Sequence, residues 1–164
     1  MRKQKGFSLI ELLIVIAIIL IIAAIAVPNL LRSKMAANET SAVGSVRTIN
    51  NAEVLYSTTY PDTGYAANIG FLGGPIGAAC NPAPNTACII DPVLSNAPNQ
   101  KSGYGFAAVG AAGLNGGPSV AFTVNGDPIT FGTTGARDFF SDQTFVIRYS
   151  TNGNPAAATD KPLQ

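Results

Sequence analysis

The sequence of 164 residues contains no histidine and only two cysteines, Cys80 and Cys88. Without an imidazole in the chain, neither cysteine has the histidine partner that activates the thiol in Cys–His enzymes. Two cysteines alone also fall short of the four ligands of an ordinary zinc site. We therefore expect no catalytic residue, no metal centre and no cofactor, and we expect that the protein is not an enzyme.

Charged residues are also scarce, at 12% of the chain. Three of the ten basic residues, Arg2, Lys3 and Lys5, precede the first apolar run, so that seven basic and nine acidic side chains remain from Phe7 onward. This remainder has a side-chain charge of −2. Nucleic-acid binding calls for a clustered basic face, so the composition argues against a nucleic acid as partner.

Three aspartates in the C-terminal part of the chain, Asp127, Asp138 and Asp142, are candidate calcium ligands. The alternating D-x-D pattern of a calcium-binding loop is missing from the sequence around them. We interpret these residues as solvated turn carboxylates, with calcium binding as the alternative.

The chain does contain a long apolar segment near its start. Residues 7–27 number 21, and as a helix they would rise about 31 Å at ~1.5 Å per residue, which matches a hydrocarbon core of ~30 Å. The run is longer than a typical signal-peptide core, and no A-x-A-like cleavage site follows it. Because the basic residues precede it, the positive-inside rule predicts a cytoplasmic N-terminus and an external C-terminal part.

Glu11 is the one acidic residue at the start of this segment. An ionisable side chain near the centre of a membrane helix costs about 2.5 to 3.5 kcal/mol on insertion scales, so such a residue usually has a function and a partner. The alternative is that Glu11 lies near the membrane interface and reaches toward water without any special role.

The N-terminus MRKQKGFSLIELLIVIAIILIIAAIAVPNL, and within it the string KGFSLIE, resembles the N-terminus of type IV pilins and of the pseudopilins of type II secretion. The resemblance covers about the first 35 residues. It implies that a prepilin peptidase cuts between Gly6 and Phe7, and that the new Phe7 amine is then N-methylated. It further implies that this amine neutralises Glu11 of an adjacent subunit when the chain polymerises with copies of itself.

Pro28 follows the apolar run and lacks an amide hydrogen, so it must end, kink or loosen a helix. The sequence after it is a good helix former as far as Tyr60, which predicts that the helix resumes. Pro28 is therefore either a bend or melted stretch that serves assembly, or a helix boundary at the membrane surface.

The second half of this helix has an apolar face at helical spacing, which predicts packing against a sheet. The residues of that face are Leu31, Met35, Ala42, Val46, Ile49 and Tyr56. Glu39, Arg47 and Glu53 are interpreted as solvated residues or as members of weak pairs between subunits.

The remainder predicts a connection followed by a sheet. Residues 61–102 are rich in Pro, Gly and Asn, which indicates a long surface connection. Its two cysteines face an oxidising compartment, so a Cys80–Cys88 disulfide is expected. Four β-rich segments follow, near Tyr104 and from Ser119, Ala136 and Thr144, with SDQT as a tight hairpin connection.

The predicted fold class is α+β, with a long N-terminal helix packed on a small antiparallel sheet, as in the pilin fold that the resemblance implies. The predicted parts are a leader (1–6), a transmembrane or filament-core helix (7–28), an amphipathic half (29–60), the connection (61–102), the sheet (103–150) and a loose C-terminal tail (151–164).

Three functions remain open. The first is a pilin that forms a type IV pilus, for which the resemblance implies adhesion, twitching motility or DNA uptake and a pilus assembly machinery in the cytoplasmic membrane. The second is the major pseudopilin of a type II secretion system. The third is a bitopic membrane protein whose head binds a ligand or catalyses a reaction.

Overall fold

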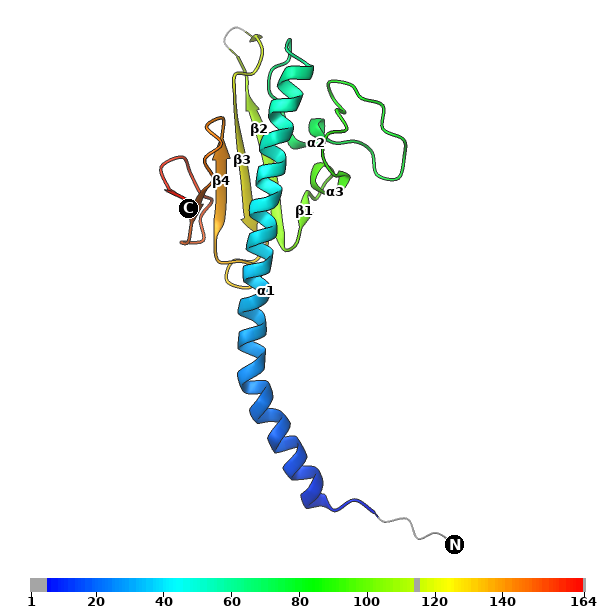
Figure 1. The fold of residues 1–164 in the computed structure, drawn as a ribbon, viewed down its shortest axis with the longest axis vertical. Helices are drawn as coiled ribbons and strands as arrows, with labels where there is room; N and C mark the ends of the chain where they lie inside the picture. Colours follow the sequence, from blue (N-terminus) through cyan, green and yellow to red (C-terminus); the bar gives the residue numbers. More distant parts are fainter. Residues whose placement is uncertain (1–5, 114–115, 164) are drawn as a thin grey trace. The chain divides into compact units, whose positions relative to one another are not determined.

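The computed structural model describes residues 6–113 and 116–163, and the chain forms two compact units, Met1–Lys34 and Met35–Gln164. One helix, α1 (Leu9–Thr59), contributes residues to both units (Figure 1). Residues 1–5 of the expected leader, which include Arg2, Lys3 and Lys5, lie outside the described residues.

α1 continues through Pro28, which lies inside the helix. Since proline has no amide hydrogen, the carbonyl of Ala24 lacks its usual donor at this point. The interpretation of Pro28 as a helix boundary is therefore wrong, and the expected helix beyond it is confirmed.

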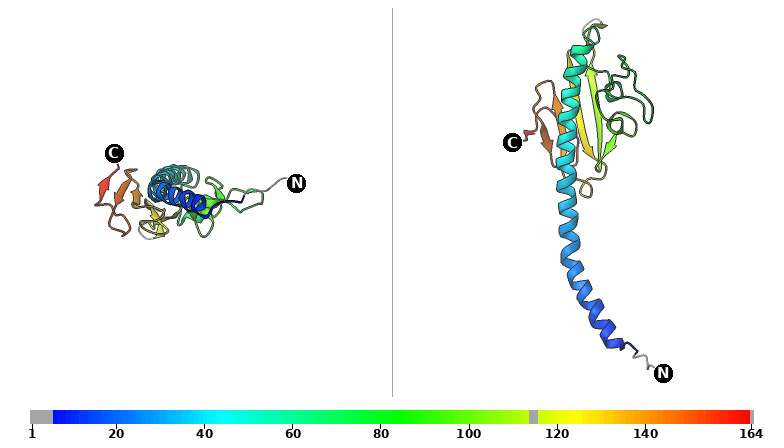
Figure 2. Two further views of the ribbon diagram at one scale, coloured as in Figure 1. Left: turned by 90° about the horizontal axis from the view of Figure 1, so that it is seen from below. Right: turned by 45° about the vertical axis from the view of Figure 1, so that its right-hand side comes forward.

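In the second unit, the C-terminal part of α1 covers one face of an antiparallel sheet (Figure 1 and Figure 2). The six strands follow one another in chain order, as a meander does. They are β1 (Gln100–Lys101), β2 (Tyr104–Ala111), β3 (Ala121–Pro128), β4 (Asp138–Asp142), β5 (Arg148–Ser150) and β6 (Lys161–Pro162). This arrangement confirms the α+β fold class, and it adds the short edge strands β1 and β6 to the four predicted strands.

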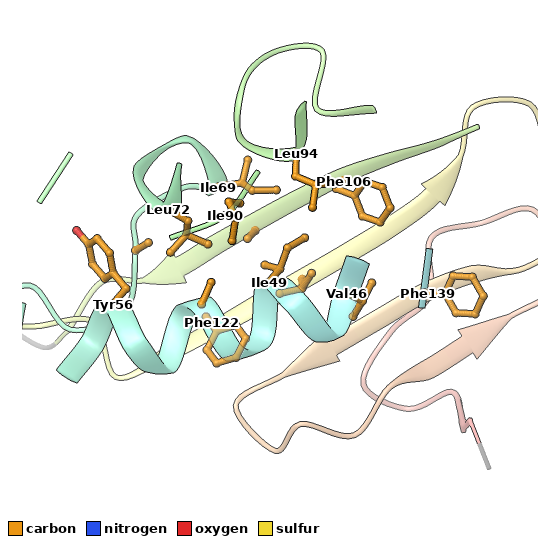
Figure 3. Packing of buried hydrophobic residues seen from close by; sticks show 14 of the residues in the cluster. Val46, Ile49, Tyr56, Ile69, Leu72, Ile90, Leu94, Phe106, Phe122 and Phe139 are labelled. Carbon is orange, nitrogen blue, oxygen red and sulfur yellow. The ribbon is translucent and has the colours of Figure 1, made fainter. Parts of the chain in front are cut away.

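The core lies between α1 and the sheet (Figure 3). Val46, Ile49 and Tyr56 of the predicted face are completely buried, as Ala42 is, and they pack with Phe122 and other residues of the sheet. Leu31 was expected on this face, but it belongs to the first unit and is 51% exposed. The helical spacing therefore identified the packed face but not where packing begins.

The sequence predicted a surface loop for residues 61–102, but this connection also contributes to the core. It contains two short helices, α2 (Ile69–Leu72) and α3 (Pro92–Ser95), which place Leu72 and Leu94 in the core. Asn68 caps α2 and Asp91 caps α3, each by accepting a hydrogen bond from a backbone amide. The connection therefore extends the core beyond the sheet edge.

The link between β4 and β5 is longer than the predicted SDQT hairpin. The last paired residues are Phe140 and Arg148, although the amide of Phe145 does bond to the carbonyl of Asp142 at 2.9 Å. The turn thus lies where it was expected, but the strand that was predicted to begin at Thr144 begins at Arg148.

The C-terminal segment is ordered over its described residues, so the prediction of a loose tail is wrong. Ala156 is buried, and the amide of Leu163 donates to the carbonyl of Ile147 at 2.7 Å. The Arg148 guanidinium donates to the carbonyl of Asp160 at 2.9 Å. These contacts add β6 to the sheet and hold the tail against β5.

Candidate functional site

The junction between Gly6 and Phe7 is exposed and precedes the helix. Residues 6–8 have no regular structure, and Phe7 is 82% exposed. Proteases bind extended backbone that they can approach closely, and glycine hinders that approach least. The peptide bond expected to be cut is therefore open to an enzyme.

Ser8 and Glu11 form the start of α1. The backbone amide of Ser8 donates to Glu11 Oε2 at 2.9 Å, and the amide of Leu12 donates to the carbonyl of Ser8 at 3.3 Å. A glutamate three residues after a serine N-cap is half of a capping box. Glu11 thus has a local partner within its own chain, which our sequence analysis missed although the S-x-x-E spacing signals it.

The apolar side chains of the first unit are exposed along the whole of residues 9–27, apart from the half-buried Ala23. α1 is long and apolar enough to cross a membrane. An apolar surface of this extent in water is unfavourable, so it needs lipid or other protein around it. The N-terminal part of α1 is therefore a membrane-anchoring segment.

Cys80 and Cys88 form the expected disulfide, with their Cα atoms 6.1 Å apart. The Cys88 amide donates to the carbonyl of Gly73 at 3.1 Å, and the Tyr56 hydroxyl donates to the carbonyl of Pro84. The disulfide loop is thus attached both to the end of α2 and to α1.

Glu39 and Glu53 are buried, so the expectation that they are solvated is wrong. Glu39 Oε2 lies 2.7 Å from an Arg137 guanidinium nitrogen, and its Oε1 accepts from the Ala136 amide at 2.9 Å. Both contacts join α1 to the two residues just before β4. Arg47 is exposed, as expected.

Glu53 is completely buried, and its Oε2 accepts a hydrogen bond from the Ala66 amide at 2.8 Å. Its other oxygen has no partner among the described residues. Burial raises the pKa of Glu53 to about 7, against the smaller opposing effect of the Ala66 hydrogen bond. Glu53 is therefore a proton-binding group within the core.

Asp127 and Asp138 lie on neighbouring strands, one position beyond the paired residues Gly126 and Phe139. Asp138 is 4% exposed, and burial together with the nearby Asp127 raises its pKa to about 6. The interpretation as a solvated turn carboxylate is therefore wrong for Asp138. Asp142 does lie at a turn, where its side chain accepts from the Thr144 amide at 2.9 Å.

Within residues 6–113 and 116–163, no group of three or more His, Cys, Asp or Glu side chains is placed to hold a metal ion. Asp127 and Asp138 each keep one buried oxygen without a hydrogen-bond partner in that part of the chain.

Comparison with known proteins finds a family motif at the N-terminus of the chain. Residues 1–27 match the family model described as the prokaryotic N-terminal methylation motif. The N-terminus of this chain is therefore similar to the N-termini that this family model describes.

Among curated proteins, the chain is 65% identical over 40 residues to the type IV wide pilus major component PilA4 of Thermus thermophilus, covering 24% of this chain and 30% of that protein. It is 42% identical over 80 residues to a fimbrial protein of Pseudomonas aeruginosa, covering 43% and 51%. It is 41% identical over 66 residues to the type II secretion system core protein G of Vibrio cholerae, covering 38% and 45%.

The expected resemblance to type IV pilins and to type II secretion pseudopilins is thus confirmed for the N-terminal part. The match spans at most about half the length of these relatives, between 30% and 51%. No solved structure matches the chain.

Proposed function

We propose that the protein is the structural subunit of a type IV pilus. The observation that carries this proposal is the exposed apolar N-terminal part of α1, residues 9–27, in which Glu11 is the single carboxylate. An open Gly6–Phe7 junction precedes it, and an α+β head, residues 35–164, follows it. The N-terminal methylation motif in residues 1–27 and the similarity to curated proteins named as a pilus component and a fimbrial protein support the proposal. A chain with this organisation is suited to polymerise rather than to catalyse.

Before assembly, the precursor crosses the cytoplasmic membrane once through its apolar segment. Arg2, Lys3 and Lys5 keep the N-terminus in the cytoplasm, and the head lies outside. A prepilin peptidase then cuts between Gly6 and Phe7 and methylates the Phe7 amine. An external head is consistent with the Cys80–Cys88 disulfide, because disulfides persist in oxidising compartments.

Cleavage changes the electrostatics at the start of α1. It leaves Phe7 with a cationic amine next to Ser8, whose amide already donates to Glu11. In the filament, the Phe7 amine of one subunit pairs with Glu11 of its neighbour. At ~4 Å and an effective dielectric constant of ~20, such a pair attracts by about 4 kcal/mol. A subunit in the wrong axial position would lose this attraction and leave Glu11 without its counter-ion.

Pro28 contributes by leaving the Ala24 carbonyl without a helical donor, which makes local loosening of α1 less costly. A helix that yields at this point can adjust as subunits leave the membrane and pack. Each subunit contacts its neighbours through different surfaces, so the assembly does not close and grows into a fibre.

The second candidate is the major pseudopilin of a type II secretion system. The observation that favours it is the similarity to core protein G, which covers 38% of this chain. A pseudopilin would undergo the same processing and make the same contacts through its apolar helix, but its fibre would stay in the cell envelope.

The experiment is to shear filaments from the surface of cells that express the protein and to determine the N-terminus of the subunit by mass spectrometry. N-methyl-phenylalanine from Phe7 in abundant long fibres supports the pilin. Mature protein confined to the envelope, together with a loss of protein secretion on deletion of the gene, supports the pseudopilin. A mature chain that still begins at Met1 contradicts both.

A further inference from the structure

A groove lies on the head between α1 and the β5–β6 edge of the sheet. Two hollows of about 540 and 430 Å³ form it, and they have Arg137 and Leu163 in common. Val43, Gly44 and Arg47 line it from α1, and Lys161 lines it from β6. The groove therefore combines apolar side chains, among them Val43 and Leu163, with an open helix surface, three cations and the carboxylate of Glu39.

The residues that line the groove have a net positive charge, whereas the rest of the head (residues 35–164) has a net negative charge. Residues 35–164 contain eight acidic and five basic side chains, and three of the five basic ones, Arg47, Arg137 and Lys161, line this groove. Arg137 is held by Glu39 and by the rings of Phe139 and Tyr149. Arg47 and Lys161 are exposed at the margin, where an acidic group of another molecule can reach them.

At Gly44, the floor of the groove is helix backbone without a side chain. A Cβ at this position would meet nothing within 4 Å, so packing within the subunit does not require glycine. Glycine inside a helix is nevertheless less stable than alanine there. Close approach of a second molecule to the backbone of α1 is a physical reason for a glycine at this place.

The opposite flank of the head carries exposed side chains of the complementary kinds, one acidic and one apolar. α3 and the connection lie on one side of α1, and β4 to β6 lie on the other (Figure 1). Asp91 caps α3 and is exposed, and the nearby Val93 is 51% exposed. Asp91 can pair with Arg47 and Lys161 while Val93 packs against Val43 and Leu163.

We propose that the groove receives residues 91–93 of a second copy of this chain. The inference rests on the proposed function and assigns one contact between heads in the fibre. Because the groove and α3 lie on different flanks, the contact is heterologous and leaves both copies with a site for a further copy, which is the geometry of an open filament.

Charge exchange tests the contact. Arg47→Glu combined with Lys161→Glu, and separately Asp91→Lys, should each reduce the yield of sheared filaments about tenfold or more, because like charges across an interface repel. Asp91→Lys combined with Arg47→Glu and Lys161→Glu should restore filaments. Thr48→Glu, on an exposed position of α1 outside the groove, and Asp62→Lys, outside residues 91–93, are matched controls that should assemble as the original chain does.

A covalent readout separates this inference from the proposed function. Thr40 lines the groove, so one chain carries Thr40→Cys and a second, co-expressed chain carries Val93→Cys. Mild oxidation should then give a mixed disulfide-linked dimer of the two chains in filaments or in membranes. A dimer without filaments would contradict the pilus and support the groove. Normal filaments from the charge-reversed chains, with no mixed dimer, would overturn the groove inference alone.

Discussion

At the scale of single residues, the buried carboxylates of the head determine how its stability depends on pH. Glu53 lies in the core against the Ala66 amide, and Asp138 lies beside Asp127. Each binds its proton more tightly when the chain is folded, because burial disfavours the charged form. Such groups stabilise the folded state most where they are protonated.

We predict that the head is more stable at pH 5 than at pH 7.5. The folded pKa of Glu53 is about 7 and its reference value is 4.5, so this contribution is fully present below the reference value and is lost as the pH rises to the folded pKa. The difference is on the order of 3 kcal/mol at ~1.4 kcal/mol per pKa unit. Urea unfolding of the full chain in detergent at several pH values measures it.

Glu53→Gln, which resembles the protonated acid, should remove most of this pH dependence. Asp138→Asn should remove the smaller part that arises between the reference pKa of 3.8 and the folded value of about 6. Asp62→Asn, at an exposed turn position, is the control and should leave the pH dependence unchanged. An unaltered pH profile for Glu53→Gln would mean that Glu53 is ionised in the fold.

At the scale of elements, the turn before β4 depends on a glycine. A Cβ at Gly135 would overlap the ring of Tyr104, whose hydroxyl donates to the carbonyl of Arg137 at 2.8 Å. Tyr104 is completely buried and cannot move aside without disturbing the core. The close approach of this turn to the core therefore excludes a side chain at position 135.

We predict that Gly135→Ala lowers the free energy of unfolding by about 1 to 3 kcal/mol, the usual effect of forcing extra atoms into a packed core. Gly44→Ala in the unassembled chain is the matched substitution. It should be neutral or stabilising by up to about 1 kcal/mol, because alanine is the better helix former and space is available. Thermal unfolding of both variants by circular dichroism distinguishes them, and equal stability of the two would contradict the proposed overlap.

The disulfide acts on the connection. It closes a short loop that is hydrogen-bonded to α1 through the Tyr56 hydroxyl and to α2 and its C-cap through the amides of Ala87 and Cys88. Cys80→Ser combined with Cys88→Ser should lower stability by about 2 to 3 kcal/mol in the loop-entropy account. Limited proteolysis should then cut within residues 74–88 while β2 to β4 stay intact, and cleavage spread over the sheet would show that the loop is needed for the whole head.

Sequence patterns predicted the elements whose signal is local. The spacing of Ala42, Val46, Ile49 and Tyr56 identified the packed face of α1, since helical periodicity needs only neighbouring residues. Helices of four residues such as α2 and α3 have almost no stability of their own and form because Leu72 and Leu94 are buried by distant residues. The burial of Glu39 and Glu53 likewise depends on residues outside α1, Arg137 and Ala66, so no pattern within the helix predicts it.

At the scale of the whole molecule, the two units have different requirements. The second unit buries its own core between α1 and the sheet, whereas the apolar side chains of the first unit remain exposed in the single chain. Burial of apolar area contributes about 25 cal/mol per Å² wherever it occurs. In the proposed function, lipid around the precursor and neighbouring copies in the fibre would supply the same kind of apolar surroundings, so that polymerisation would exchange one for the other.

Because hydrophobic burial alone sets no axial position, the charge of Glu11 should decide whether copies align. We predict that Glu11→Ala leaves membrane insertion and leader cleavage intact but reduces sheared filaments about tenfold or more, since the attraction to the Phe7 amine of the neighbour is lost. Glu11→Gln is the decisive control, because its amide oxygen can still accept from the Ser8 amide but carries no charge. If Glu11→Gln assembles as the original chain does, capping of α1 rather than charge pairing explains the need for Glu11. Membrane fractionation and quantitative blotting of sheared fibres measure both variants side by side.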